Sequence, residues 1–321
     1  MAASKSTSTW NRQNSALNSL NLCAKVLGLK ICWPLTPNVL RQFVTWALKT
    51  RKLSVATIKM YISDLKNIHK LKDLDCNNFE DFFINSMLKG AENLAMYENI
   101  TKKTRLVMTF PLLKLIGHEI ANSAWTEDSK RVFWTACCVA FFGSFRMGEL
   151  LSLNETVFGT ETLTWKNITF NTPNSAVIQI EFPKNSRAID CHFVDIFEIL
   201  DTTFCPYTCL KNLMESKETF VKKNWPVFTF TNGKFLTTTL FTKTIRKFLF
   251  PHLGENANRF SGHSFRAGIP AAISNHPNLL SNDDVCKWGR WSSNSYQAYT
   301  RLKLTARREI FKKLLFTIGM K

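Results

Sequence analysis

The longest apolar stretch of the chain, Val132–Phe145, sets the strongest limit on the fold. Thr135, Gly143 and Ser144 interrupt it. A helix that crosses a bilayer needs about 20 apolar residues, so this stretch is too short to span one. A segment this apolar instead predicts a helix buried inside a protein core. The rest of the chain must supply the elements that cover it.

The charge of the chain indicates its class of partner. There are 42 Lys and Arg residues against 24 Asp and Glu residues, and the net charge of +18 is spread along the whole chain. Such a protein attracts polyanions beyond contact distance. Nucleic acid is the leading partner and an anionic membrane surface is the rival. The membrane alternative is weaker because the sequence offers no anchor.

The cysteines and the N-terminus bear on the cellular compartment. Nine cysteines are an odd number, and Met1–Asn21 is polar and unlike a signal peptide. We therefore expect reduced thiols and an intracellular protein, nuclear if the host is eukaryotic. Cys205 and Cys209 have no second pair at zinc-like spacing, so no metal site is expected.

Changes of pattern along the chain predict two domains. Residues 1–15 are polar and are predicted to be disordered. Residues 16–98 form a helical domain, 99–108 a linker, and 109–321 a second domain that ends in a helix over 302–320. The linker is a basic run that includes Lys102 and Lys103. It either follows a DNA backbone or is merely flexible.

In the first domain, Pro37 begins a helix over Pro37–Lys49, and Ser54 caps a second helix. A third helix is predicted over Phe79–Glu92. The second helix carries a buried stripe (Ile58, Tyr61, Ile62, Leu65 and Ile68). Lys59, Lys66 and Lys70 recur on another face of it. Such a row is usually a solvated surface, but in so basic a protein it is a plausible face for phosphate groups.

The second domain mixes helices with a short sheet. Helices are predicted over Pro111–Ile120 and Ser129–Phe145, and helical periodicity returns after Thr208. Between them, Leu163–Val194 alternates apolar and polar residues, which predicts two or three antiparallel strands with Lys184 at a hairpin tip. The predicted fold class is mainly α with a small antiparallel β-sheet.

Four separate stretches contain residues that could perform chemistry. Arg146 follows the apolar helix, with Glu149 placed to orient it. Lys184 lies at the hairpin tip. In Ser261-Gly-His-Ser-Phe-Arg-Ala-Gly268, a proton carrier, His263, and a phosphate-binding group, Arg266, are one helical turn apart. Near the end, Tyr296 and Tyr299 lie in polar, basic surroundings, where a phenol can act as a nucleophile. Each stretch alone is more often structural.

The ordered set resembles the tyrosine recombinase (phage-integrase-like) family over most of the chain. The segment Gly-Arg-Trp-Ser-Ser-Asn-Ser-Tyr-Gln-Ala-Tyr-Thr-Arg (289–301) is most similar to eukaryotic mobile-element recombinases of the Crypton and DIRS type. The resemblance implies a helical core-binding domain followed by an α+β catalytic domain. It also implies a site-specific recombinase that cuts and rejoins double-stranded DNA.

The resemblance also implies a role for each matching residue. Arg146 and Arg266 would clamp the phosphate, Lys184 would protonate the leaving oxygen, and His263 would manage the proton of Tyr299, the nucleophile. Trp291 or Arg290 occupies the position of a family histidine or tryptophan; Trp291 is favoured there, and Arg290 is assigned to DNA binding. Pro270 departs from the pattern and predicts a kink or an irregular first turn.

The family mechanism proceeds through a 3′-phosphotyrosine and needs no cofactor. The resemblance implies a tetramer on two DNA duplexes. The amphipathic helix over 302–320 would dock either on a neighbouring subunit or on its own domain. Three alternatives remain: a type IB topoisomerase-like enzyme, a non-catalytic DNA-binding protein derived from a transposon, and a carboxylate-metal transposase. The last needs an acidic triad, and the only acidic motif that suggests one is the adjacent pair Asp283-Asp284.

Overall fold

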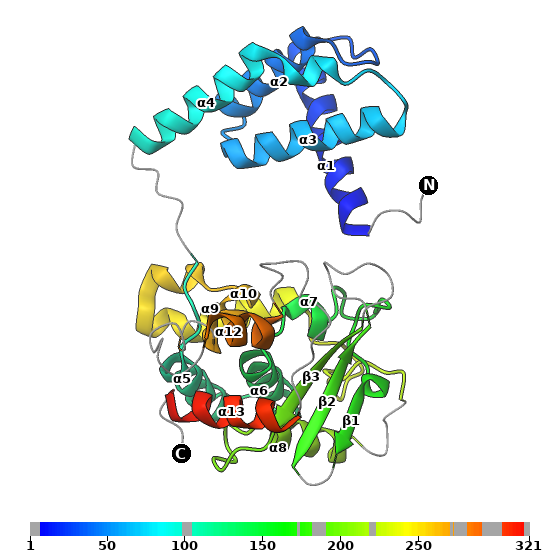
Figure 1. Cartoon of the computed structure of the whole chain (residues 1–321). Coiled ribbons are helices and arrows are strands. Elements are labelled where there is room, and N and C mark those ends of the chain that lie inside the picture. The colour runs from blue at the N-terminus through cyan, green and yellow to red at the C-terminus, as the bar shows by residue number, and fades with distance from the viewer. Residues whose placement is uncertain are drawn as a thin grey trace. The chain divides into compact units, whose positions relative to one another are not determined.

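The computed structural model describes residues 7–97, 105–171, 174–181, 191–217, 223–269, 272, 281–290 and 304–317. The chain divides into two compact units, residues 1–102 and 103–321. The division falls within the range predicted as a linker. Figure 1 shows α1 to α4 in the first unit, and the sheet with the remaining helices in the second.

The first unit is helical. Its elements are α1 (Thr7–Leu27), α2 (Pro37–Lys49), α3 (Val55–Leu71), the 3-10 helix η2 (Asn77–Glu80) and α4 (Phe82–Tyr97). The helix predicted over Pro37–Lys49 is confirmed, because Pro37 is at its first turn and the Thr36 hydroxyl accepts a hydrogen bond from the Val39 amide. The Ser54 hydroxyl likewise caps α3 by accepting from the amide of Thr57.

The prediction of disorder over residues 1–15 is wrong from Thr7 onward, because α1 begins there. Arg12 donates two hydrogen bonds, of 2.7 and 2.8 Å, to the carboxylate of Asp64 on α3. Asp64 is fully buried. One charged residue of this polar segment therefore pairs with a residue of α3, and this ion pair holds α1 against α3.

The second unit combines helices with a small sheet. Its elements are α5 (Phe110–Ala121), α6 (Glu127–Phe142), α7 (Met147–Leu150), η3 (Trp165–Asn167), β1 (Ile168–Asn171), β2 (Ser175–Ile180), β3 (His192–Phe197), α8 (Pro206–Glu215), α9 (Thr238–Leu253), η4 (Gly254–Arg259), α10 (Gly262–Arg266), α12 (Asn282–Gly289) and α13 (Leu304–Thr317).

The apolar stretch predicted to be buried forms α6, the core helix of this unit. Every residue from Ala136 to Phe142 is buried, and the helix packs against α5, α8 and α10 (Figure 1). It ends at Phe142, with Gly143 as its C-cap, earlier than the predicted end at Phe145. Ser144 follows with a left-handed φ of 48°. The chain therefore turns sharply at this point, just before Arg146.

The three strands form one antiparallel sheet in the order β1-β2-β3. Ile178 of β2 pairs with Ile168 of β1 and with Val194 of β3. Ala176 and Ile178 are fully buried, and β3 contacts α8. The predicted fold class, mainly α with a small antiparallel sheet, is confirmed. The predicted hairpin tip with Lys184 lies between β2 and β3, outside the described residues.

The end of the predicted linker belongs to the second unit. The amide of Leu106 donates to the Arg259 carbonyl (3.2 Å), and the amide of Met108 donates to the Ser264 carbonyl (2.9 Å). Met108 is fully buried. The assignment of these residues to the linker is therefore wrong, because an extended segment satisfies its backbone groups against another part of the chain.

The C-terminal helix α13 packs on its own domain. Phe311 lies in the core and contacts the rings of Phe142, Phe197 and Trp288. Leu314 is also buried. Phe311 and Leu314 are thus covered within the chain, which corresponds to the second predicted alternative, docking of the helix on its own domain.

Candidate active site

The turn between α6 and α7 positions the first arginine. Arg146 caps α7, and its backbone amide donates to Oε2 of Glu149 at 2.9 Å. Its guanidinium Nη1 donates to Oε1 of the same carboxylate at 2.7 Å. The two bonds join Glu149 to Arg146, the residue that Glu149 was predicted to orient by hydrogen bonding.

The second arginine reaches the same turn from α10. Nη1 of Arg266 donates to the Ser144 carbonyl at 2.8 Å and lies 4.0 Å from Oε2 of Glu149. Its Nη2 donates to the carbonyls of Gly289 and Arg290 at the end of α12. Arg266 therefore connects three segments that are far apart in the sequence.

A third arginine, Arg290, completes the cluster, although the sequence assigns it to DNA binding. Its Nη1 donates to the Gly143 carbonyl at 3.0 Å. Its Nη2 lies 3.2 Å from the Ser144 carbonyl and 3.1 Å from Oε2 of Glu149. The guanidinium stacks over the Phe145 ring, 4.8 Å from its centroid. Both terminal nitrogens of Arg290 thus donate to groups of the chain itself.

Two glycines allow α10 to come close to the other elements. A Cβ on Gly262 would lie 2.4 Å from Cγ of Met147, the first residue of α7. A Cβ on Gly268 would lie 2.6 Å from the carbonyl oxygen of Met108 and 2.5 Å from the ring of Phe141. Any side chain at these positions would push Arg266 away from Arg146 and Glu149.

The charges of the cluster shift the pKa values of its members. Burial lowers the pKa of Arg266 to about 10, and the positive charges of Arg290 and Arg146 add to the effect. Burial also lowers the pKa of Arg290. For Glu149, burial raises the pKa, but the charge of Arg290 and the bonds from Arg146 outweigh it and leave the pKa below its usual value. Glu149 is therefore ionised at neutral pH.

The cluster has more positive than negative charge. Three guanidinium groups surround one carboxylate, which leaves two positive charges without a counter-charge among these four residues. Arg146 is the most exposed of the arginines: 18% of its side chain is accessible, against 5% for Arg266 and 8% for Arg290. The arrangement can bind an oxyanion that approaches from the Arg146 side.

The remaining predicted catalytic groups are placed differently. His263 is exposed, one turn before Arg266 on α10. The helix α10 ends at Arg266, so it needs no hydrogen bond from residue 270; Pro270 itself lies outside the described residues. Lys184, Trp291 and Tyr299 also lie outside them, as do Lys102 and Lys103. The segment that contains Trp291 and Tyr299 joins Arg290 of the cluster to α13.

The lysine row of α3 is partly engaged within the first unit. Lys59 forms an ion pair with Glu92 at 2.7 Å, and Lys66 forms one with Glu80. Lys70 is exposed. Exposed ion pairs of this kind contribute at most about 1 kcal/mol. Glu92 and Glu80 partly neutralise Lys59 and Lys66. Because these ion pairs are weak, another anion such as a phosphate group can replace the carboxylates.

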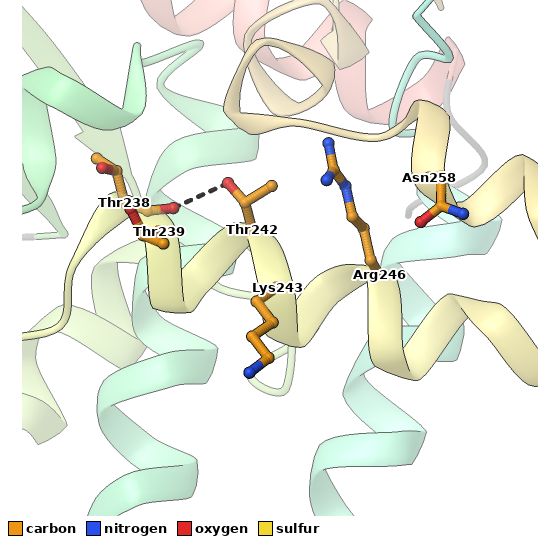
Figure 2. Close-up of a pocket in the computed structure, with 6 residues that line it drawn as sticks. All are labelled: Thr238, Thr239, Thr242, Lys243, Arg246 and Asn258. Atoms are coloured by element: carbon orange, nitrogen blue, oxygen red, sulfur yellow. Dashed lines mark hydrogen bonds between the residues drawn. The ribbon is translucent and has the colours of Figure 1, made fainter.

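A hollow between α9 and η4 is a feature that was not predicted from the sequence. It has a volume of about 580 Å³ and is lined by Thr238, Thr239, Thr242, Lys243, Arg246 and Asn258 (Figure 2). Nε of Arg246 donates to the Phe260 carbonyl, just before α10. The signal was present in the sequence: α9 carries Lys243, Arg246 and Lys247 and no acidic residue.

No helix among the described residues is long and apolar enough to cross a membrane. Over the same part of the chain, no group of three or more His, Cys, Asp or Glu residues is arranged to hold a metal ion.

Solved structures share this architecture. No family model matches the sequence, and no curated protein matches it. The chain is similar to the XerH site-specific recombinase in its pre-cleavage complex with difH, with a TM-score of 0.52 and 18% identity over 86% of this chain and 69% of that one. For the post-cleavage complex with palindromic difH, the TM-score is 0.50, with 15% identity over 87% and 69%. The chain therefore has the fold of this site-specific recombinase.

Proposed function

We propose that the chain is a site-specific tyrosine recombinase of a mobile element of the Crypton or DIRS type, which cuts and rejoins double-stranded DNA. The observation that carries the proposal is the cluster of Arg146, Arg266 and Arg290 around Glu149, with its excess of positive charge. The cluster occurs in a fold shared with a recombinase whose complexes before and after cleavage are known.

The chemistry of a DNA phosphodiester explains why such a cluster is useful. The phosphodiester already carries a negative charge, and in-line attack places more charge on its non-bridging oxygens. Guanidinium groups held in place before the reaction stabilise that charge without reorganising. Arg146, the most accessible arginine, would bind one oxygen, and Arg266 would supply charge from behind it.

In the proposed reaction the Tyr299 oxygen attacks phosphorus. An O–P bond to tyrosine forms, the bond from phosphorus to the 5′ oxygen breaks, and the tyrosine proton passes toward His263. Lys184 gives a proton to the leaving 5′ oxygen. The phosphotyrosine conserves the energy of the broken bond, so attack by another 5′-hydroxyl rejoins the strand without ATP.

Chain connectivity supports the choice of Tyr299. It lies nine positions after Arg290, whose side chain is in the cluster. Nine residues can extend over about 30 Å. The other end of the same segment leads into α13, which packs on the same domain. Both ends are thus held in the unit that contains the arginines.

The basic surfaces would hold the DNA backbone. The hollow between α9 and η4 offers threonine hydroxyls, Lys243 and Arg246, which are typical phosphate-binding groups. On the first unit, Lys70 and the exchangeable pairs of Lys59 and Lys66 offer further contacts. We also propose a tetramer on two duplexes, as the family resemblance implies.

A trapping assay tests the proposal. Duplexes that contain candidate element ends are nicked at successive positions, so that a short strand with the leaving 5′-hydroxyl diffuses away and the covalent intermediate accumulates. Adducts that survive denaturing detergent are expected with the natural chain. They should be absent with Tyr299→Phe and present with the matched control Tyr296→Phe.

Other outcomes would redirect the proposal. Adducts that persist in Tyr299→Phe and vanish in Tyr296→Phe would move the nucleophile. Binding without adducts on all substrates would favour a non-catalytic DNA-binding protein. Relaxation of supercoiled plasmid by a monomer, without site preference, would favour a type IB topoisomerase.

A further inference from the structure

Arg290 occupies an unusual position at the end of α12. Its backbone is in the left-handed region, with φ 54° and ψ 47°, and its amide donates to the Cys286 carbonyl. L-residues adopt this conformation rarely, at a cost of about 1 kcal/mol or more. The conformation ends the helix and lets the side chain reach Glu149 and the turn before Arg146.

The bonds of Arg290 join the two sides of Arg146. On one side are the carbonyls of Gly143 and Ser144, in the turn that precedes Arg146. On the other side is Oε2 of Glu149, the oxygen that also receives the Arg146 amide. One guanidinium therefore fixes both the backbone before Arg146 and the carboxylate that orients it.

The environment of Arg290 does not suit a direct DNA contact. Only 8% of its side chain is accessible, and its face lies over the Phe145 ring. Its Nη1 and Nη2 already donate to protein acceptors. Its Nε is buried, without a hydrogen-bond partner among the described residues. DNA could reach it only by displacing bonds of the turn.

We infer that Arg290 is a positioning residue, which sets Arg146 and Glu149 for phosphate binding and does not itself contact DNA. This inference rests on the proposed function. A planar guanidinium fits the task because it presents several donors in fixed directions, and three acceptors surround it here. A lysine would offer one nitrogen, which cannot reach both the turn and Glu149 with the same geometry.

The test separates binding from catalysis in Arg290→Gln and Arg290→Lys. A direct phosphate contact would lower the salt dependence of DNA affinity by about one unit of slope in Arg290→Gln. We expect an unchanged slope, because Arg146 still supplies the phosphate contact. The single-turnover rate of adduct formation at saturating DNA should fall about 100-fold, since a small displacement of catalytic groups costs that much. Arg290→Lys should recover little of the rate.

Matched variants make the result specific. Lys312→Gln removes an exposed cation on α13 and should leave slope and rate unchanged. A double-mutant cycle with Glu149→Gln needs no DNA: the fall in Tm of the double variant should be smaller than the sum of the two single falls. A reduced salt slope, or additive falls in Tm, would overturn the inference. If the natural chain forms no adduct, the proposed function fails, and the cycle alone decides whether Arg290 holds Glu149.

Discussion

A Cβ atom on Gly262 would come within 2.4 Å of Cγ of Met147 and within 2.8 Å of its Cβ. Because Gly262 has no Cβ, the start of α10 can lie against the start of α7. This close approach places Arg266 near Glu149. Gly262→Ala should lower the free energy of unfolding by about 1–3 kcal/mol, the usual cost of overpacking. It should also slow adduct formation. Urea unfolding and the trapping assay measure the two effects.

Gly148 provides the control for this prediction. A Cβ there would meet nothing within 4 Å, although Gly148 adjoins Met147. Gly148→Ala should leave the free energy of unfolding unchanged or raise it, because alanine favours the helical conformation. Equal stability of Gly262→Ala and Gly148→Ala would contradict the close packing of α7 and α10.

Replacing Ser144 with glycine should stabilise the folded protein. It is fully buried with φ at +48°, and its hydroxyl has no partner among the described residues. Ser144→Gly should raise the free energy of unfolding by up to about 1 kcal/mol, because glycine adopts a positive φ without strain. Ser144→Val should lower it. Thermal unfolding measures the Tm of both variants. A higher Tm for Ser144→Val than for Ser144→Gly would contradict the positive φ at this position.

Removal of residues 1–15 tests the corrected N-terminus. A disordered tail could be deleted without effect, whereas α1 supplies Arg12 to the buried carboxylate of Asp64. The truncated chain should have a lower urea midpoint for its first unit. Arg12→Met in the full chain should cost about 1–3 kcal/mol, since it leaves a buried charged acceptor without its donor. A midpoint unchanged by both alterations would restore the disordered assignment.

Glu149 should make the second unit sensitive to acid. Its pKa in the folded protein lies below the reference value of 4.5. The folded state therefore binds fewer protons than the unfolded state, and the stability from Glu149 is complete above about pH 4.5 and is lost as pH falls through the lowered pKa. Glu149→Gln should be less stable than the natural chain at pH 7 and closer to it at pH 3. A difference that is the same at both pH values would exclude this linkage.

The cysteines should react in two groups. Burial raises the pKa of the Cys137 thiol well above its usual value. Burial and a hydrogen bond with Cys209 do the same for Cys138. Cys32 and Cys191 are exposed. Iodoacetamide at pH 8 should alkylate the exposed pair within minutes and the buried pair only after unfolding, because the thiolate is the reactive form. Peptide mass spectrometry would reveal early modification of Cys137 or Cys138 if α6 were open.

Local patterns in the sequence were sufficient where the signal lay within one element. Pro37 and Thr36 define the start of α2 because their effects are confined to one turn. The helix predicted over Phe79–Glu92 begins instead at Phe82, because the Asp81 carboxylate caps its first turn by accepting a bond from the Ile84 amide. Ion pairs between distant segments, such as Arg12 with Asp64, leave no periodic trace.

The candidate site was predictable in part for the same reason. Arg146 with Glu149, and His263 with Arg266, are recognisable from short spacings, and the structure brings Arg266 to Glu149. The role of Arg290 was missed, because it depends on a left-handed residue that ends α12 and on acceptors more than 140 positions away. A short sequence pattern therefore cannot include both Arg290 and its acceptors.

The excess charge around Glu149 has a practical consequence for handling the protein. A cluster that binds one oxyanion, as we propose, would not distinguish strongly between a nucleotide linkage and the sulfate or phosphate of a buffer. Such salts should occupy the arginines during purification and compete with substrate later. Chloride buffers of matched ionic strength are therefore the appropriate background for measuring strand cleavage.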